Sequence, residues 1–278
     1  YKGKSSEGYE VIRQRRFEKQ KKLGLIPKDA SITASTHVAW SSLSDSLKQV
    51  EEQKMEVYAA MIDRMDQKIG EIIQKLRDQG KLDNTVFIFL SDNGASAEMV
   101  DIPGDGKIGT VGHWTSLGAD WANVGNTPLR YYKNYSHEGG IKTPMIISWP
   151  KGLNNQNPIL DFPAHLIDIM PTLGDLSGAK YPTEYGGKTI LPMEGQSLLP
   201  AITGEIQNRT QPLFWEWSVG GAVRLGDWKL VRFGKNAEWE LYHLDSDPFE
   251  IENVANSYPE KVRELAQLYD QWKTKVTL

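Results

Sequence analysis

The sequence contains no cysteine among its 278 residues. This absence excludes disulfide bonds and thiolate metal sites, and it removes cysteine from the candidate catalytic nucleophiles. It leaves the cellular compartment open.

Long hydrophobic runs are also absent. No apolar stretch approaches the roughly 18 residues that a membrane-spanning helix needs, so we expect no segment embedded in a membrane. The segment from Lys2 to Glu10 is rich in charge and lacks the apolar centre of a signal peptide. A net charge of −4 gives no general attraction to nucleic acid, so we expect no nucleic-acid partner.

The residues that are present are typical of a folded globular protein. Hydrophobic residues make up 39% of the chain and charged residues 24%, which indicates a packed core rather than disorder. The length suits one large domain, or one large domain with a smaller one beside it.

Two helices are predicted in the first part of the chain. A basic, polar helix is expected from Gly8 to Gly24. A longer helix is expected to start at an N-cap, Ser44, to reach Gln79, and to end at a left-handed Gly80. The spacing of its apolar residues predicts one buried face, made by Tyr58, Ile62, Met65, Ile69, Ile72, Ile73 and Leu76.

Two apolar, β-rich runs predict strands of an α/β sheet. The run from Asn84 to Ser91 is unbroken, which favours a central strand of a parallel sheet, covered on both faces. A second strand is expected from Pro144 to Trp149, followed by a helix from Ala164 to Leu176. This order of elements indicates a three-layer α/β domain.

The pattern changes from about Pro212. Four short, aromatic-rich runs separated by turns predict a small antiparallel sheet, and the segment from Pro259 to Val276 predicts a packing helix. The expected strands are Leu213–Trp217, Ala222–Leu225, Lys229–Phe233 and Glu240–Leu244. We therefore divide the chain into a first domain over residues 1–205 and an α+β subdomain over residues 206–278.

The first candidate site lies where the apolar run ends. Asp92 and Asn93 follow it directly, and ligands of open α/β sheets bind at the carboxyl ends of strands. Both side chains offer oxygen, which suits calcium or magnesium. The alternative is an ordinary turn, since Asp, Asn and Gly also favour turns. Taken alone, Asp92-Asn93-Gly94 favours the turn.

The second candidate site is a glycine-containing loop before the next strand. Lys133 and His137 can offer a positive charge or hydrogen bonds to an anion, and two glycines after them allow a tight loop. The alternative is a solvated lysine with a histidine that fixes the loop. His113 lies in another glycine-rich loop, where it either approaches a substrate or is a plain surface histidine.

Taken together, these segments resemble the sulfatase family of the alkaline-phosphatase superfamily, and most closely its bacterial arylsulfatase branch. The likeness runs in the family's order along the whole chain, and this collinearity favours the metal site over the turn at Asp92. It rests on Met61–Asp66, Gly70, Leu82–Thr85, Phe89–Glu98, Asn126–Pro128, Lys133–Pro144, Trp149–Gly152, Asp168–Thr172, Val223–Leu230 and Leu241–Asn253.

The resemblance implies a fold, a reaction and roles for particular residues. It implies part of a three-layer α/β/α alkaline-phosphatase-like sheet and hydrolysis of a sulfate ester. Asp92 and Asn93 would be ligands of calcium, with magnesium the less favoured ion. Lys133 would contact the sulfate oxygens of a small-molecule or carbohydrate sulfate ester, with an auxiliary role for His137. The resemblance assigns no role to His113, for which a substrate contact stays the alternative to a plain surface histidine. Bacterial relatives are often exported, which favours a periplasmic or secreted protein.

One part of the family pattern is missing. The family's nucleophile is a formylglycine made from Cys or Ser in a Cys/Ser-x-Pro-x-Arg motif, and the nearest match, Ser257 to Lys261, ends in Lys and starts a late helix. The likeness begins midway through the family pattern, so we expect the amino-terminal half of a larger enzyme to be the partner of this chain. We predict no sulfatase turnover and weak metal affinity for the chain alone. The alternatives are a phosphate or phosphonate ester hydrolase of the same superfamily and a non-catalytic, sulfatase-derived module.

Overall fold

The computed structural model describes residues 1–153 and 159–276 of the chain. Short 3₁₀ helices cover Trp40–Ser42, Leu82–Asn84 and Leu166–Asp168. The α-helices are α1 (Gly8–Lys22), α2 (Asp45–Asp78), α3 (Gly118–Gly125), α4 (Glu138–Ile141), α5 (Ile169–Ser177), α6 (Leu199–Ile202) and α7 (Pro259–Val276). The strands are β1 (Phe87–Leu90), β2 (Asp101–Pro103), β3 (His113–Thr115), β4 (Met145–Ser148), β5 (Glu184–Tyr185), β6 (Lys188–Thr189), β7 (Leu213–Trp217), β8 (Gly220–Leu225), β9 (Trp228–Phe233) and β10 (Glu240–His243).

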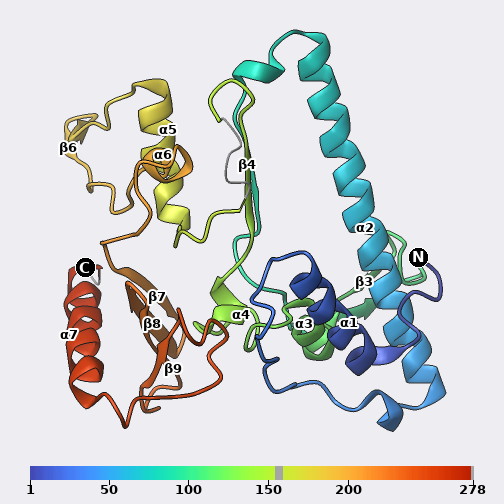
Figure 1. Cartoon of the computed structure of the whole chain (residues 1–278). Coiled ribbons are helices and arrows are strands. Elements are labelled where there is room, and N and C mark those ends of the chain that lie inside the picture. Colours follow the sequence, from blue (N-terminus) through green and yellow to red (C-terminus); the bar gives the residue numbers. More distant parts are fainter. Residues whose placement is uncertain (154–158, 277–278) are drawn as a thin grey trace.

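The elements form two bodies joined by the β1–β4 ribbon (Figure 1). Helices α1, α2 and α3 lie on one side, and the carboxyl-terminal sheet with α7 lies on the other, below α5 and α6. Among the described residues no helix combines the length and the apolar character needed to cross a membrane.

The first body has a small aromatic core between α1, α3 and the start of α2. Tyr9 and Trp121 are almost fully buried and meet edge to face, with ring centroids 4.7 Å apart. The indole nitrogen of Trp121 donates to the carbonyl of Glu51 at 3.1 Å, which fixes the first turns of α2 against this core. The predicted basic helix from Gly8 is confirmed as α1.

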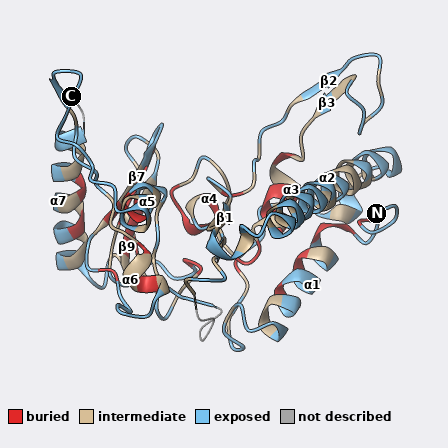
Figure 2. Cartoon of the chain, turned by 90° about the horizontal axis from the view of Figure 1, so that it is seen from above, coloured by how far each residue is buried: buried red, intermediate tan, exposed pale blue. Residues whose placement is uncertain are grey.

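Helix α2 has the predicted ends but not the predicted burial. The hydroxyl of Ser44 accepts a hydrogen bond from the amide of Leu47, and Gly80 has a left-handed φ of 65°. The predicted buried face is wrong for the described structure, because α2 contains no buried residue and Ile72 is 56% exposed. After its first turns the helix stays exposed or partly exposed along its length (Figure 2).

The central strand also differs from the prediction. β1 pairs with β4 in an antiparallel ribbon, with Phe87 opposite Ser148 and Leu90 opposite Met145, so the predicted parallel pairing is wrong for this pair. The strand is not covered on both faces either, since Phe89 is 44% exposed. The apolar run correctly indicated a strand, but an apolar run does not reveal the direction of its neighbour.

The carboxyl-terminal sheet confirms the predicted antiparallel sheet with a packing helix. Its strand order is β10-β9-β8-β7, and every described pair is antiparallel. One face packs on α7, where Val223, Leu230 and Leu241 meet Leu265 and Tyr269 of the helix. Alternate residues point to the other face, as the pleat of a strand requires.

That other face of the sheet carries charged side chains, although much of it is buried. Lys229 of β9 is fully buried, and Glu240 and Tyr242 of β10 lie on the same face. The face turns toward the segment between α3 and α4 and contacts it directly.

The remaining predicted elements are confirmed with shifted bounds. The strand from Pro144 is confirmed as β4, and the helix expected from Ala164 starts later, as a 3₁₀ turn that continues into α5. The side chain of His165 accepts from the amide of Ile167, which caps the start of this turn. The boundary near residue 205 stays a prediction, and residues 277–278 of the second domain lie outside the described residues.

Candidate functional site

The antiparallel β1–β4 ribbon brings the two candidate segments to the same edge. Because the strands run in opposite directions, the end of β1 and the start of β4 are neighbours. The hydroxyl of Thr143 donates to the carbonyl of Ser91 at 2.7 Å, which ties the chain just before β4 to the chain just after β1. The antiparallel pairing of β1 and β4 thus brings the two candidate segments together.

Gly94 lets the two loops pack backbone against backbone. Its amide donates to the carbonyl of Gly140 at 2.9 Å. A Cβ at position 94 would lie 1.7 Å from the carbonyl oxygen of Gly139, a distance that no side chain can adopt. The glycine is needed for this close approach, beyond any role in a turn.

Asn126 connects the same loops with its side chain. Its amide oxygen accepts from the backbone of Ala95 at 3.0 Å, and its amide nitrogen donates to the carbonyls of Tyr131 at 2.9 Å and Gly139 at 2.6 Å. Asn126 belongs to a segment that resembles the family, but the sequence alone indicates no role for it. An Asn directly after a helix was the available signal, because such residues often bond to nearby backbone groups.

Asp92 and Asn93 lie on this shared edge with oxygen atoms available. The side-chain nitrogen of Asn93 donates to the carbonyl of Gly94 at 2.9 Å, which leaves its amide oxygen for another partner. The Asp92 side chain is exposed. Over residues 1–153 and 159–276, no group of three or more His, Cys, Asp or Glu side chains could hold a metal ion. Calcium takes about six to eight oxygen ligands. Asp92 and Asn93 offer the right type of ligand atom but supply only some of the ligands that the ion needs.

The backbone of Lys133 is bonded to the loop that follows Asp92 and Asn93. Its amide donates to the carbonyl of Ala95 at 3.0 Å, and its ammonium group donates to Glu98 at 2.7 Å. The hydrogen bond from Lys133 lowers the pKa of the Glu98 carboxyl. Two non-glycine residues flank Lys133 with left-handed backbone, Tyr131 with φ 60° and Asn134 with φ 81°. Such conformations persist only where the surroundings hold them.

His137 is placed differently from Lys133. Its side chain is only 1% exposed, and its Nε2 atom lies 3.5 Å from Glu240 Oε1. That separation suits an ion pair with a protonated ring, but within the described residues neither ring nitrogen has a partner in hydrogen-bonding geometry. The ring of Tyr131 packs edge-on against it at 4.9 Å. The auxiliary catalytic role of His137 stays a prediction.

His113 belongs to the projecting β2–β3 hairpin (Figure 2). Its Nε2 atom lies 2.7 Å from a carboxylate oxygen of Asp101 on the paired strand. This contact with the ring lowers the pKa of Asp101. His113 lines the same broad hollow as Asp92, Asn93 and Lys133, and its substrate contact stays a prediction.

Comparison with known proteins shows the family of the chain. A model of the sulfatase family matches residues 5–179, which is more than half of the chain. The chain belongs to the sulfatase family. A model of the carboxyl-terminal region of N-sulphoglucosamine sulphohydrolase matches residues 129–276.

Curated relatives extend the match over nearly the whole chain. An uncharacterized sulfatase of Schizosaccharomyces pombe is 32% identical over 97% of this chain and 52% of its own length. An arylsulfatase of Klebsiella aerogenes is 31% identical over 77% of this chain and 49% of its own length. The sulfatase chain thus spans about half the length of these curated relatives.

Solved structures share the fold. A structure from a Bacteroides thetaiotaomicron locus for the metabolism of multiple glycosaminoglycans matches with a TM-score of 0.58 at 26% identity. The match covers 76% of this sulfatase chain and 43% of the other. A structure in complex with a neocarrahexaose matches with a TM-score of 0.60 over 95% of this chain and 54% of the other, at 19% identity.

The sulfatase chain also contains a buried ionic cluster that the sequence reasoning missed. The ammonium of Lys229 lies 2.7 Å from a carboxylate oxygen of Glu138 and 2.8 Å from one of Glu250. All three side chains are almost completely buried. Glu250 also accepts from the backbone amide of Glu138 at 2.8 Å. The available signal was a lysine near the start of a short strand rich in apolar residues, where a buried charge requires a partner.

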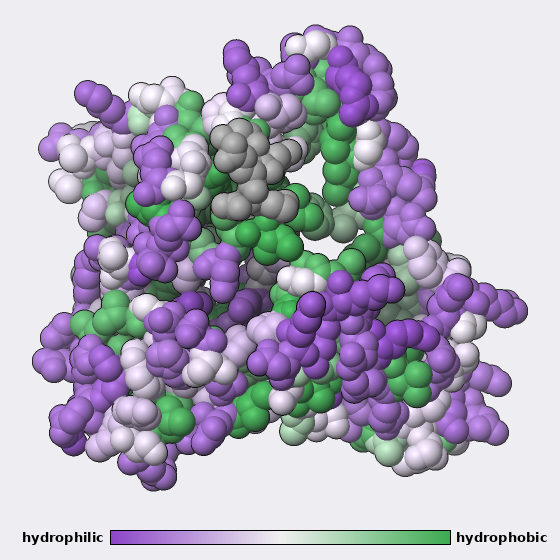
Figure 3. Space-filling model, viewed as in Figure 1, coloured by the Kyte–Doolittle hydropathy of each residue, from purple (hydrophilic) through white to green (hydrophobic). Residues whose placement is uncertain are grey.

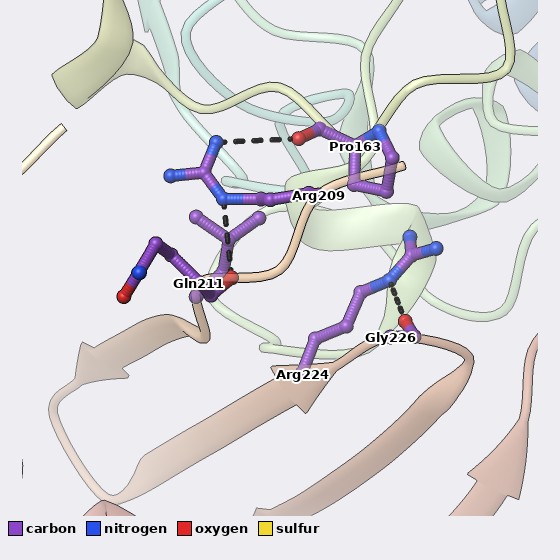
Figure 4. Close-up of a pocket in the computed structure, with 6 residues that line it drawn as sticks. Pro163, Arg209, Gln211, Arg224 and Gly226 are labelled. Atoms are coloured by element: carbon purple, nitrogen blue, oxygen red, sulfur yellow. Dashed lines mark hydrogen bonds between the residues drawn. The ribbon is translucent and has the colours of Figure 1, made fainter. Parts of the chain in front are cut away.

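A second, small cavity does not compete with this site. It lies between Arg209 and Arg224, and its volume of about 10 Å³ holds about one water molecule (Figure 4). Arg209 donates to the carbonyls of Pro163 and Gln211, and Arg224 donates to that of Gly226. These contacts turn the two guanidinium groups toward the backbone, and a sulfate ester is too large to enter.

Proposed function

We propose that this chain forms the carboxyl-terminal half of a sulfuric ester hydrolase and supplies part of its metal and sulfate site. The observation that carries the proposal is the placement of Asp92, Asn93 and Lys133 on two loops that are bonded to each other. These bonds run from Gly94 to Gly140 and from Lys133 to Ala95. Family membership supports the same reaction class.

Asp92 and Asn93 would hold a calcium ion, with magnesium the less favoured ion. Their oxygen atoms match the ligands that calcium prefers, and further ligands would come from the rest of the protein. Bound calcium would neutralise negative charge on the sulfate group.

Lys133 would hold the sulfate oxygens through its ammonium group. Its contact with Glu98 is partly exposed, so a sulfate group can replace this carboxylate at small cost. Fixed positive charge near the sulfur stabilises the negative charge on the transferring group in the transition state. A formylglycine nucleophile is expected outside this chain, whose sequence contains no Cys and no Ser-x-Pro-x-Arg motif. This chain alone is therefore expected to show no turnover.

The partner that completes the site would be the amino-terminal half of the same enzyme. The apolar stripe of α2 and the β1–β4 ribbon border a hollow lined by hydrophobic side chains (Figure 3). Met61 and Ile146 are 65% and 61% exposed there. Further strands beside β1 and β4 would cover these side chains, pair the open strand edges and complete a three-layer α/β/α sheet.

The substrate class is proposed from relatives. Relatives in Bacteroides thetaiotaomicron are an N-acetylgalactosamine-6-O-sulfatase and an N-acetylglucosamine-6-O-sulfatase, 29% and 25% identical to this chain. A choline-sulfatase of Rhizobium meliloti is 27% identical. We propose a small-molecule or carbohydrate sulfate ester as the substrate.

The proposal is tested by producing the chain alone and together with the amino-terminal half of a related sulfatase. Hydrolysis of p-nitrophenyl sulfate and p-nitrophenyl phosphate is measured with calcium and with a chelator. We expect calcium-dependent sulfate hydrolysis by the pair only, and its loss in Asp92→Ala and Lys133→Ala. Faster phosphate than sulfate hydrolysis would replace the proposal with a phosphate or phosphonate ester hydrolase. A well-folded pair without activity on either ester would favour a non-catalytic module.

A further inference from the structure

The loop that carries Lys133 is fixed at both ends by the carboxyl-terminal sheet. Arg130 lies three residues before Lys133, and Glu138 lies five residues after it. Each of these end residues makes an ionic contact with the charged face of the sheet. The sheet therefore reaches the candidate sulfate site through contacts that Lys133 itself does not make.

The first contact joins Arg130 to β10. A guanidinium nitrogen of Arg130 lies 2.6 Å from Glu240 Oε2, and the same nitrogen donates to the hydroxyl of Tyr242. Burial disfavours the charge on Glu240, but contacts with His137, Tyr242 and Arg130 outweigh it and lower its pKa to about 2. The low pKa keeps this carboxylate charged near neutral pH, where it can pair with Arg130.

The second contact joins Glu138 to β9. Lys229 approaches Glu138 at 2.7 Å, and both side chains are buried. Between the two contacts, the ring of Tyr135 stacks on Phe233 of β9 with centroids 4.1 Å apart. The loop is thus held at its start, its middle and its end by two adjacent strands.

We propose that Glu240 and Lys229 are positioning residues, which set the place of the Lys133 ammonium group through the two ends of its loop. This inference rests on the proposed function, since it takes Lys133 as the sulfate-binding group. The left-handed backbone of Tyr131 and Asn134 supports it, because these conformations need outside contacts to hold them. Without the sheet contacts the loop relaxes, and the ammonium group of Lys133 loses its fixed position.

The test uses the whole 278-residue chain and inorganic sulfate as the probe. The backbone amide signals of Lys133 and Asn134 are followed by NMR during a sulfate titration, with chloride keeping the ionic strength constant. Glu240→Gln removes the charge at the first contact without removing the side chain. We expect it to weaken sulfate binding on the order of 3- to 10-fold, since small misplacements of a binding group have large effects.

The matched control is Glu216→Gln on the same sheet. Glu216 of β7 lies 2.6 Å from Lys273 of α7 and does not contact the loop among the described residues. We expect an unchanged sulfate affinity in this variant. Thermal unfolding of both variants shows whether a difference in affinity is separate from a difference in stability.

A double-mutant cycle distinguishes a positioning role of Glu240 from a merely structural role. If Glu240 acts through Arg130, then Arg130→Met weakens sulfate binding as much as Glu240→Gln, and the double variant is no worse than either. Additive losses would overturn the proposal. So would an unchanged sulfate affinity in Glu240→Gln while Lys133→Ala abolishes the response. An unchanged response in Lys133→Ala would instead overturn the sulfate-binding role of Lys133, and the proposed function with it.

Discussion

Replacement of Lys229 by Met is the change with the largest expected effect on the fold. Lys229 is fully buried and lies within 2.8 Å of two carboxylates, those of Glu138 and Glu250. Met fills a similar volume but leaves two negative charges close together in the protein interior. Loss of one partner of a buried ion pair typically costs about 3–5 kcal/mol, and here two carboxylates lose the same partner.

The cost is large relative to the total stability of a typical domain, about 5–15 kcal/mol. Burial opposes the ionisation of Glu138, but the charge of Lys229 outweighs it and holds the pKa of Glu138 below its ordinary value. In the native chain the charged Glu138 carboxylate therefore stabilises the fold at pH values above the pKa that this group has in the unfolded chain. That stability is lost as the pH falls through the lower, folded pKa.

Removal of Lys229 reverses the sign of this pH dependence. Burial then acts without a compensating cation, so the carboxyl pKa values in the folded variant are expected to rise. When the pKa of a carboxyl group is higher in the folded state than in the unfolded state, the stability that it contributes is lost as the pH rises through the folded-state pKa. The destabilisation by Lys229→Met is therefore expected to be largest at about pH 7 and to shrink toward about pH 4.

Urea unfolding, followed by the fluorescence of the nine tryptophans, measures the change. Lys273→Met, which breaks the partly exposed pair with Glu216, is the control and is expected to cost about 0–1 kcal/mol. Addition of Glu138→Gln and Glu250→Gln to Lys229→Met removes the unpaired charges and is expected to recover stability. A loss below about 1 kcal/mol at pH 7, or a loss that grows on acidification, would refute the reasoning.

Three further changes test the candidate site. Gly94→Ala forces a Cβ against the carbonyl oxygen of Gly139, so we expect separated loops and an altered amide signal of Lys133 by NMR. Asn126→Ala removes three hydrogen bonds, at about 1 kcal/mol each, and is expected to lower the free energy of unfolding by about 3 kcal/mol in urea titrations. Glu98→Gln weakens the partly exposed competitor for Lys133, so sulfate affinity by NMR titration is expected to rise about twofold; a fall would count against displacement of Glu98 by sulfate.

Local patterns predicted the helices and strands because their signals lie within a few residues. Ser44 and Gly80 marked the limits of α2, since capping and left-handed backbone depend on single residues. The short, aromatic-rich runs and the turns between them identified the antiparallel sheet at the carboxyl end. Burial was predicted less well, because Ile72 and Phe89 are apolar whether or not a partner covers them.

The sequence by itself identified the oxygen ligands Asp92 and Asn93 and the cation Lys133 as candidates, because their chemistry is that of their side chains. Only the tertiary structure decided that β1 and β4 run antiparallel, that Asn126 bonds three backbone groups, and that Lys229 meets Glu138 and Glu250. The partners in the ionic cluster are up to 112 residues apart in the sequence, and no local pattern records which distant charges meet. The chemical groups of a side chain follow from the residue itself, whereas the partners that it contacts depend on how the chain packs.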